Sequence, residues 1–231
     1  MTDEQRVAVV TGGSGAIGSA VVAALQNSGH RTVVLSRTGD INCDLGSESS
    51  TKQAAAAVLE RYGRCDVFVH CAGRYDAMCL SELDLQRWRD HMMVNVESSL
   101  LLLQEFTKGM VDRGFGRIVF VSSDGVWSPP NAEFLPYTAG KAALLGVMRT
   151  LAVTFGANGI SVSAVAPGLT DTPFSRPVAG EDAMRAVVEK QAMKRPLTPA
   201  DAANTVAFLA SAGAQALTGQ VLVVDGGIHL R

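Results

Sequence analysis

A tyrosine and a lysine lie four residues apart at the start of an apolar helical segment, "FLPYTAGKAALLGVMRTLA", from Phe134 to Ala152. Side chains four apart share one face of an α-helix, so Tyr137 and Lys141 should lie side by side. An ammonium beside a phenol favours the phenolate, which lowers the pKa of the phenol and suits it to proton transfer. A structural alternative exists, because proline favours the first helical turn and both stems can lie on apolar surface with their tips in water.

A glycine-rich loop follows the first apolar run of the chain. In "TGGSGAIG", the pattern G-x-G-x-x-G falls on Gly13, Gly15 and Gly18, between a predicted strand and a predicted helix. Glycines let backbone N–H groups approach a pyrophosphate at the positive N-terminus of a helix. The pattern alone is weak because glycine-rich turns are common, but its strand–loop–helix context favours dinucleotide binding.

The residue that grips the adenosine ribose should follow about 20 residues later, at the end of the second strand, and is normally acidic. The sequence there is "LSRTGD", with Ser36 at the acidic position and Arg37 after it. A guanidinium suits a 2′-phosphate, and no carboxylate repels it, so the sequence favours NADP over NAD. The alternative is that Arg37 is a solvated loop charge.

These residues need a scaffold, and strand and helix signals alternate along the chain. Strands are predicted at residues 6–11, 32–36, 66–70, 117–122, 160–166 and 220–225, and helices at 17–27, 50–62, 85–113, 134–152 and 199–212. Such alternation predicts an α/β fold, a parallel sheet covered by helices, in one domain spanning residues 1–231. Residues 170–198 are a long connection of uncertain order, of the kind that often covers a site.

The connection between the second strand and the next helix is unusually short. Only "RTGDINCDLGSES" separates Ser36 from Ser50, too little for a helical crossover and another full strand. The sequence therefore predicts that one helix is missing here and that "INCD" forms a short edge strand or none.

Composition excludes several classes of protein. The chain has 231 residues, 47% hydrophobic and 18% charged, with a net charge of -2, which gives no broad attraction to nucleic acid or anionic membrane. It has no apolar run of membrane-spanning length and no signal-peptide pattern, so a soluble cytoplasmic enzyme is expected. The four cysteines show neither CxxC spacing nor a zinc pattern, which predicts reduced thiols and no metal.

The motifs "TGGSGAIG", "CDL", "HCAG", "MVNVESS", "VSS", "YTAGK", "VAPGLTDT" and "TGQVLVVDGG" occur in this order over residues 7–227. In this the chain resembles the short-chain dehydrogenase/reductase family, and most closely its 3-oxoacyl-carrier-protein-reductase-like branch. The resemblance implies a Rossmann-type doubly wound sheet with helices on both faces, a nicotinamide cofactor, and a homotetramer or homodimer through the helices at 85–113 and 137–156.

The same resemblance implies the site residues. The catalytic tetrad maps onto Asn95, which would hold a water in a proton relay, and onto Ser123, Tyr137 and Lys141, with Ser122 as the alternative serine. Residues implied to bind the cofactor are Gly12, Ser14, Gly15, Ile17, Gly18, Ser36, Arg37, Asp44, Leu45, Cys71, Ala72, Gly73, Tyr137, Lys141, Pro167, Gly168, Thr170 and Thr172.

Four departures from the family pattern matter. Ala16 replaces the middle glycine of the fingerprint, and Ser14 and Gly15 leave the loop without the basic residue of many NADP-preferring relatives. Cys71 replaces an asparagine amide by a weak thiol donor. Ser123 lies 14 positions before the tyrosine, one more than is usual in the family.

In the fold that the resemblance implies, seven further residues would surround the substrate: Arg74, Tyr75, Met78, Trp127, Phe134, Leu169 and Phe174. Apolar walls with few polar groups indicate a substrate larger than a short alcohol, aromatic or polyketide-like, unless several of these residues belong to the core or to a subunit contact. The resemblance leaves a carrier-bound substrate as an open alternative. Carrier-protein reductases tend to have basic residues beside the strands that start near Arg117 and Ile160; here Arg113 is basic, but Asn158 carries no charge at the second place.

The sequence as a whole indicates an NADPH-dependent reductase that converts a carbonyl substrate into a secondary alcohol. An NAD-dependent alcohol dehydrogenase is the nearest alternative. A dinucleotide-binding regulatory protein without catalysis is the third, and the presence of both Tyr137 and Lys141 argues against it.

Overall fold

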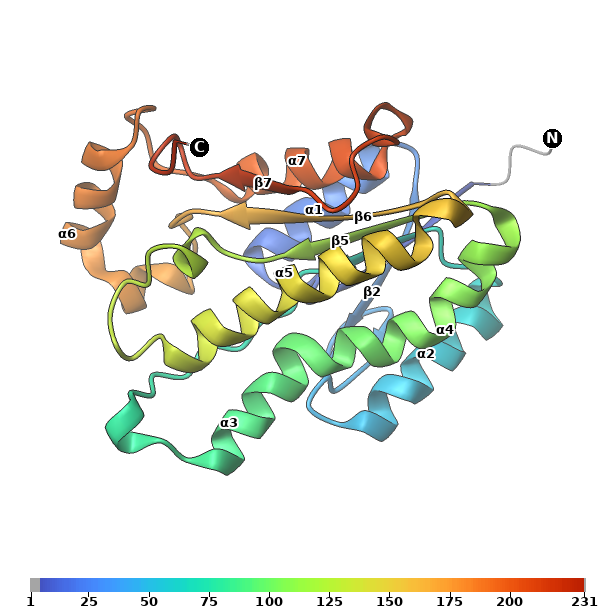
Figure 1. The fold of residues 1–231 in the computed structure, drawn as a ribbon, viewed down its shortest axis with the longest axis horizontal. Helices are drawn as coiled ribbons and strands as arrows, with labels where there is room; N and C mark the ends of the chain where they lie inside the picture. Colours follow the sequence, from blue (N-terminus) through green and yellow to red (C-terminus); the bar gives the residue numbers. More distant parts are fainter. Residues whose placement is uncertain (1–4, 231) are drawn as a thin grey trace.

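The computed structural model describes residues 5–230, which form a seven-stranded parallel sheet in the order β3-β2-β1-β4-β5-β6-β7 (Figure 1). The strands are β1 (Val7–Thr11), β2 (Arg31–Ser36), β3 (Ile41–Asn42), β4 (Val67–His70), β5 (Gly116–Val121), β6 (Ile160–Pro167) and β7 (Val221–Val224). The helices are α1 (Ala16–Asn27), α2 (Glu48–Tyr62), α3 (Leu85–Met92), α4 (Ser98–Arg113), α5 (Leu135–Phe155), α6 (Ser175–Lys190) and α7 (Pro199–Ala210). The expected doubly wound α/β fold is confirmed.

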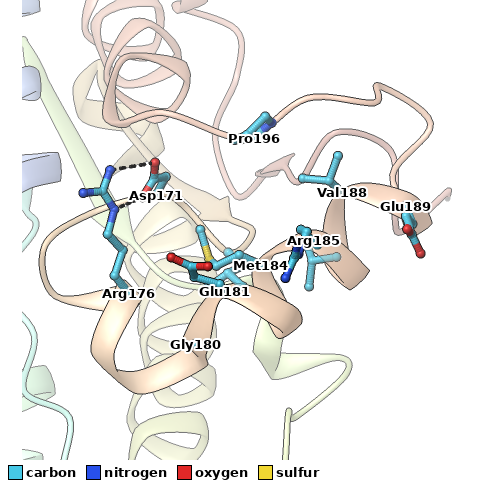
Figure 2. Close-up of a pocket in the computed structure, with 11 residues that line it drawn as sticks. Asp171, Arg176, Gly180, Glu181, Met184, Arg185, Val188, Glu189 and Pro196 are labelled. Atoms are coloured by element: carbon cyan, nitrogen blue, oxygen red, sulfur yellow. Dashed lines mark hydrogen bonds and ion pairs between the residues drawn. The ribbon is translucent and has the colours of Figure 1, made fainter.

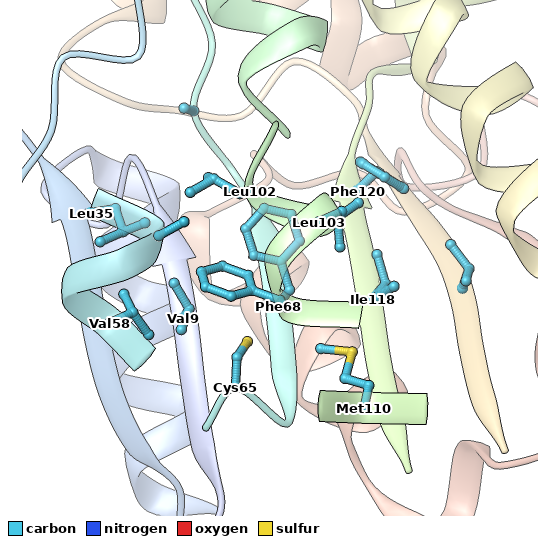
Figure 3. Packing of buried hydrophobic residues seen from close by; sticks show 14 of the residues in the cluster. Val9, Leu35, Val58, Cys65, Phe68, Leu102, Leu103, Met110, Ile118 and Phe120 are labelled. Atoms are coloured by element: carbon cyan, nitrogen blue, oxygen red, sulfur yellow. The ribbon is translucent and has the colours of Figure 1, made fainter. Parts of the chain in front are cut away.

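Helices cover both faces of the sheet. Helices α1 and α7 pack together on one face, and α2, α4 and α5 cover the other (Figure 1). Alternate residues of each strand feed the two cores: Val9 and Phe68 point into one, whereas Ala8 and Val67 point into the other. Figure 3 shows Phe68 packed between strand and helix residues of the first core. Strands buried on both faces explain the continuous apolar runs in the sequence.

The shortened first half of the chain is as predicted. No helix lies between β2 and α2, and the two-residue strand β3 pairs in parallel with the end of β2, Leu35 with Ile41 and Ser36 with Asn42. Helix α2 begins at Glu48, where the Ser47 hydroxyl accepts a hydrogen bond from the Ser50 N–H at 3.3 Å. A two-residue edge strand thus takes the place of a full strand and its crossover helix.

The helix predicted over residues 85–113 is not regular throughout. Between α3 and α4 lies a π-helical turn, η2 (Met93–Glu97), and Asn95 is in its middle. A π turn inserts one extra residue into a helical turn and is found mostly at functional sites. It changes the direction in which Asn95 faces relative to the rest of the helix.

The expectation of uncertain order over residues 170–198 is wrong for most of that segment, since Ser175–Lys190 forms α6. The helix has no buried residue, so it has no apolar face whose period could reveal it in the sequence. It bends at Gly180, whose φ of 78° and ψ of 161° are not helical. Helix α6 lies beyond the end toward which β6 and β7 point (Figure 1).

No helix within the described residues is both long enough and apolar enough to cross a membrane.

Candidate active site

The predicted site residues lie at one edge of the sheet. Because all strands are parallel, the loops after β1, β2, β4, β5 and β6 emerge together, and the order reverses between β1 and β4. Ligands of open α/β sheets bind outside the carboxyl ends of the strands at such a reversal. The fold therefore brings the glycine loop, the loop after β2, the "CAG" segment, the "SS" pair and the "PGLTDT" loop to one place.

The glycine loop has the shape required to hold a pyrophosphate. A Cβ on Gly18 would lie 2.1 Å from the Gly12 carbonyl oxygen, and one on Gly12 would lie 2.7 Å from the Ala72 backbone. A Cβ on Gly15 would meet only the Gly12 oxygen at 3.4 Å, so packing does not demand glycine there. No side chain caps the N-terminus of α1, which leaves its first N–H groups open to an anion. This loop fits the diphosphate of a dinucleotide.

Ser36 and Arg37 lie where the ribose end of such a dinucleotide would reach. Arg37 is exposed, and its side chain has no ion-pair partner among residues 5–230. Asp40, the nearest carboxylate in the sequence, accepts a hydrogen bond from the Val34 N–H at 2.8 Å. A guanidinium left free beside a nucleotide loop fits a 2′-phosphate.

The other residues implied to bind the cofactor follow the same edge. Asp44 is exposed after β3, where its carboxylate accepts the Gly46 N–H at 2.9 Å. In the loop after β6, Thr170 donates to the Gly168 carbonyl at 2.9 Å, and the Thr172 and Ser175 hydroxyls are 3.0 Å apart. The remainder lie in these same loops or at the adjoining ends of α1 and β6: Ser14, Ile17, Leu45, Cys71, Ala72, Gly73 and Pro167. The edge thus offers a continuous track from Arg37 to Lys141.

Lys141 is buried beside Tyr137 on the first turns of α5. Its ammonium donates to the Val121 carbonyl at 2.8 Å and lies 5.9 Å from the centre of the Tyr137 ring. A Cβ on Gly73 would lie 3.3 Å from the same ammonium, so glycine keeps this space open. The side-by-side placement predicted from the four-residue spacing is confirmed.

The expected lowering of the Tyr137 pKa does not occur in the protein alone. Burial raises the pKa of Tyr137, a hydrogen bond with Ser123 opposes the rise, and the charges of Asp124 and Cys71 add to it. Burial also lowers the pKa of Lys141 to about 8 and raises that of Cys71 to about 11. For all three groups, burial disfavours the charged form by more free energy than the neighbouring charges and hydrogen bonds restore.

Only one serine of the "SS" pair reaches the tyrosine. Ser122 is buried and donates its hydroxyl to the Lys141 carbonyl at 2.9 Å, which anchors α5 to the end of β5. Ser123 hydrogen-bonds Tyr137, and its oxygen also accepts the Gly125 N–H at 3.1 Å. Residues 128–133, which precede α5, are exposed, and the Ser123–Tyr137 contact is present despite the longer spacing.

Asn95 holds the loop after β4. Its Oδ1 accepts the Arg74 N–H at 2.6 Å, and its Nδ2 donates to the Arg74 carbonyl at 3.0 Å and to His91 Nε2. Its own carbonyl accepts from His70 Nε2 at 3.1 Å, while His70 Nδ1 lies 3.0 Å from the Thr11 hydroxyl. Asn95 is therefore fully buried between two histidines.

These two histidines were not predicted from the sequence. Burial lowers the pKa of His70 to about 3 and of His91 to about 4, so both are neutral at physiological pH. Since a carbonyl can only accept, His70 carries its proton on Nε2 and accepts from Thr11 with Nδ1. The position of His91, four residues before Asn95 on a helix, is the one signal that could have revealed it.

A second unpredicted group lies next to Ser123. Ligand atoms of Asp124, Asp225 and His229 lie within 4.8 Å of one another, and His229 Nδ1 is 2.8 Å from Asp225 Oδ2. Asp225 also accepts the N–H groups of Gly227 and His229, each at 2.8 Å, so its carboxylate is already satisfied. Burial raises the pKa of Asp124 to about 6. The group ties the C-terminal turn to the loop that carries Ser123.

The residues predicted to form the pocket divide into three sets. Tyr75, Phe134 and Phe174 gather around Tyr137, with ring centroids of neighbouring pairs 4.6–6.3 Å apart. Met78 is buried and Trp127 packs on the main core, so neither is mainly a pocket wall. The remaining two, Arg74 and Leu169, lie in the loops after β4 and β6.

A cavity beneath α6 holds no member of the tetrad. It measures about 810 Å³ between the loop after β6 and both halves of the bent helix, with Leu169 and Asp171 on its inner side. Figure 2 shows the ion pair of Asp171 with Arg176, with N–O distances of 2.6 and 3.0 Å, beside Glu181 and Met184. None of the proton-transfer groups lines this cavity, and α6 supplies most of the residues that do.

A family model described as enoyl-(acyl carrier protein) reductase matches residues 6–229. The chain belongs to the short-chain dehydrogenase/reductase family. It is an NAD(P)-dependent oxidoreductase by that membership.

Relatives of this short-chain dehydrogenase/reductase cover nearly its full length. The 3-oxoacyl-(acyl-carrier-protein) reductase MabA of Mycobacterium tuberculosis is 30% identical over 97% of this chain and 93% of its own. Cis-4-hydroxycyclohexanecarboxylate dehydrogenase of Sinomonas cyclohexanicum is 33% identical over 96% of each chain. The crystal structure of an actinorhodin polyketide ketoreductase with NADPH matches with a TM-score of 0.89 and 30% identity over 98% of each chain. Carbonyl reduction is thus the general chemistry that these relatives support.

Proposed function

We propose that the protein is an NADPH-dependent reductase of a ketone substrate, with Tyr137 as the general acid. The observation that carries the proposal is the group of Ser123, Tyr137 and Lys141 at the carboxyl edge, with the ammonium tethered to the Val121 carbonyl 2.8 Å away. When bound, the cofactor supplies the hydride. The residues of this chain bind the cofactor, orient the substrate and protonate its carbonyl oxygen.

Each residue of the tetrad has one task in this proposal. Tyr137 donates its phenolic proton to the carbonyl oxygen of the substrate, and Ser123 donates a hydrogen bond to the same oxygen. Lys141 holds the nicotinamide ribose hydroxyls and faces the tyrosine with its positive charge. Asn95 fixes the loop after β4 and holds a water for reprotonation.

The protonation state of Tyr137 is compatible with reduction. Burial raises the pKa of the phenol, so the protein alone presents the protonated form that a general acid requires. Oxidation of an alcohol would require the phenolate. A secondary-alcohol dehydrogenase that uses NAD is the second candidate, favoured by the dehydrogenase relative and by the absence of a basic residue at Ser14 or Gly15.

The remaining proposals concern substrate delivery and assembly. Arg113 donates to the Cys65 carbonyl at 2.9 Å and lies 3.3 Å from Asp66, so this internal pairing supports free substrates over carrier-bound ones.

We place the enzyme in the cytoplasm as one domain that forms a homotetramer through α4 and α5. On these helices Leu100 is 36% exposed and Val153 is 87% exposed, which supports a covered face.

The test replaces the phenol and keeps its ring. In Tyr137→Phe, reduction should fall by about 10²–10⁴-fold, the usual contribution of general acid–base catalysis, with little change in NADPH affinity. Tyr62→Phe is the matched control because Tyr62 lies on α2, where its ring faces Arg31 and Arg61. Absorbance of the nicotinamide, measured with a panel of ketones and alcohols and both cofactors, separates the two candidates. A folded Tyr137→Phe protein with near-full activity would falsify the assignment.

A further inference from the structure

Four aromatic rings form one cluster, and one of them is the Tyr137 phenol that we propose as the acid. The Tyr75 ring lies 4.6 Å from Phe134, 6.1 Å from Tyr137 and 6.3 Å from Phe174, centroid to centroid. The Phe134 ring lies 5.9 Å from Tyr137 at 88°. These rings come from three separate segments: the loop after β4, the start of α5 and the start of α6.

The geometry of the rings is that of aromatic contacts, not of random apolar crowding. Tyr75 is nearly perpendicular to Tyr137 at 75° and to Phe174 at 86°, the edge-to-face arrangement that the ring quadrupole favours. Such an arrangement presents ring faces and edges to the space beside Tyr137. The flat ring of a ligand could therefore contact a ring face and a ring edge at the same time.

Core packing does not account for this cluster. Phe174 is 60% exposed, although burying a phenyl ring is favourable, and the other three rings are only partly buried. None of the four belongs to the two buried cores of the described chain. Partly exposed aromatic residues gathered in one place mark a surface that binds something apolar.

We propose that the rings of Tyr75, Phe134 and Phe174 form a subsite for a planar aromatic group of the ketone substrate, one that saturated rings of the same size fill poorly. The inference rests on the proposed function, because it places the carbonyl at Tyr137 and the aromatic group beside it. The occupant is a small molecule because the cluster includes the phenol that transfers the proton. Phe174 at the start of α6 also makes the cover of the site part of the recognition.

The substrate test uses two ketones that differ only in the flatness of one ring. We expect kcat/KM for 4-phenyl-2-butanone to exceed that for 4-cyclohexyl-2-butanone about tenfold, which corresponds to about 1.4 kcal/mol. 2-Butanone provides the activity of the site without any ring. Equal kcat/KM values for the phenyl and cyclohexyl ketones would overturn the inference and leave the reductase assignment standing.

Two variants test the residues. In Phe174→Leu and Phe134→Leu the phenyl-to-cyclohexyl ratio of kcat/KM should fall below about threefold, because leucine keeps apolar bulk but has no ring face. Phe208→Leu is the matched control, since that phenyl is also half-exposed but lies on α7, outside the cluster. If Phe134→Leu fails to fold because it begins α5, the exposed Phe174 carries the test alone. An unchanged ratio in Phe174→Leu contradicts the inference.

A binding measurement separates this inference from the proposed function. Saturation-transfer NMR with the Tyr137→Phe protein and NADPH should show the phenyl ketone bound more tightly than the cyclohexyl ketone, and Phe174→Leu on that background should remove the difference. If no ketone, including 2-butanone, is reduced by the wild-type protein, the reductase assignment fails while this ring preference can still be seen. If neither ketone binds in preference to the other, the subsite is refuted whatever the activity.

Discussion

Arg37 offers a direct test of cofactor choice through the Arg37→Ala variant. The guanidinium is exposed, and among residues 5–230 it has no acidic partner, so the mutation breaks no internal ion pair. The loop should keep its shape, because the Arg37 carbonyl still accepts the Asn42 Nδ2 at 2.7 Å and Asp40 still accepts the Val34 N–H. The loss should therefore fall on the 2′-phosphate alone.

Hydrogen bonds to a charged group contribute about 1.5–3 kcal/mol, which corresponds to about 10- to 150-fold in Kd. We expect the Kd for NADPH to rise by that factor and the Kd for NADH to stay within about twofold. Calorimetric titration of the purified chain with each cofactor measures both values. Because the Arg37 guanidinium and the 2′-phosphate would meet at an exposed site, the rise in the Kd for NADPH should become smaller as the salt concentration exceeds 0.15 M, where the Debye length is about 8 Å.

Arg31→Ala is the matched control because it removes the same charge from the opposite end of the same strand, β2. Six residues of strand separate the two positions by about 20 Å, more than a Debye length. The control should leave both affinities unchanged. Equal weakening of NADPH and NADH in Arg37→Ala, or a similar loss in Arg31→Ala, would show that Arg37 does not bind the 2′-phosphate.

Four further substitutions test other parts of the site. Asp124→Asn should gain stability over wild type as pH rises from about 4 to 6, by about 1–3 kcal/mol, because the raised pKa means that burying the charged form costs stability above that window. Gly15→Ala should fold normally but bind NADPH more weakly, whereas Gly18→Ala should destabilise the fold, because its Cβ would meet the Gly12 oxygen at 2.1 Å. His70→Phe should lose about 2–6 kcal/mol, since it removes one buried hydrogen bond from Thr11 and one from the Asn95 carbonyl, at about 1–3 kcal/mol each.

The same measurements can contradict these expectations. Urea unfolding at several pH values follows Asp124→Asn, and a stability difference that is constant between pH 4 and 7 would show that the carboxyl titrates normally. For the glycines, equal losses of stability in both variants would mean that Gly15 is also required by packing. Retention of wild-type stability by His70→Phe would show that its two hydrogen bonds contribute little.

Much of this protein is determined by local patterns in its sequence. Apolar runs such as Val7–Thr11 are short, followed by glycine and buried on both faces, so they indicate parallel strands without any knowledge of their neighbours. The spacing of Tyr137 and Lys141 places them together because the geometry of a helix is the same in every protein. The missing helix after Ser36 follows from counting residues, since a chain of that length cannot form one and return to the sheet.

Other features depended on the tertiary structure because they arise from residues far apart in the chain. Helix α6 buries no residue, so no periodicity in the sequence reveals it. The ring of Tyr75 meets Phe174 only because parallel strands bring their carboxyl ends to one edge, 99 positions apart in the sequence. The pKa of Tyr137 rises because of how many atoms exclude water around it, and that number belongs to the folded chain. Sequence spacing placed the charge of Lys141 beside the phenol, but only the packing could decide that burial raises the pKa of that phenol.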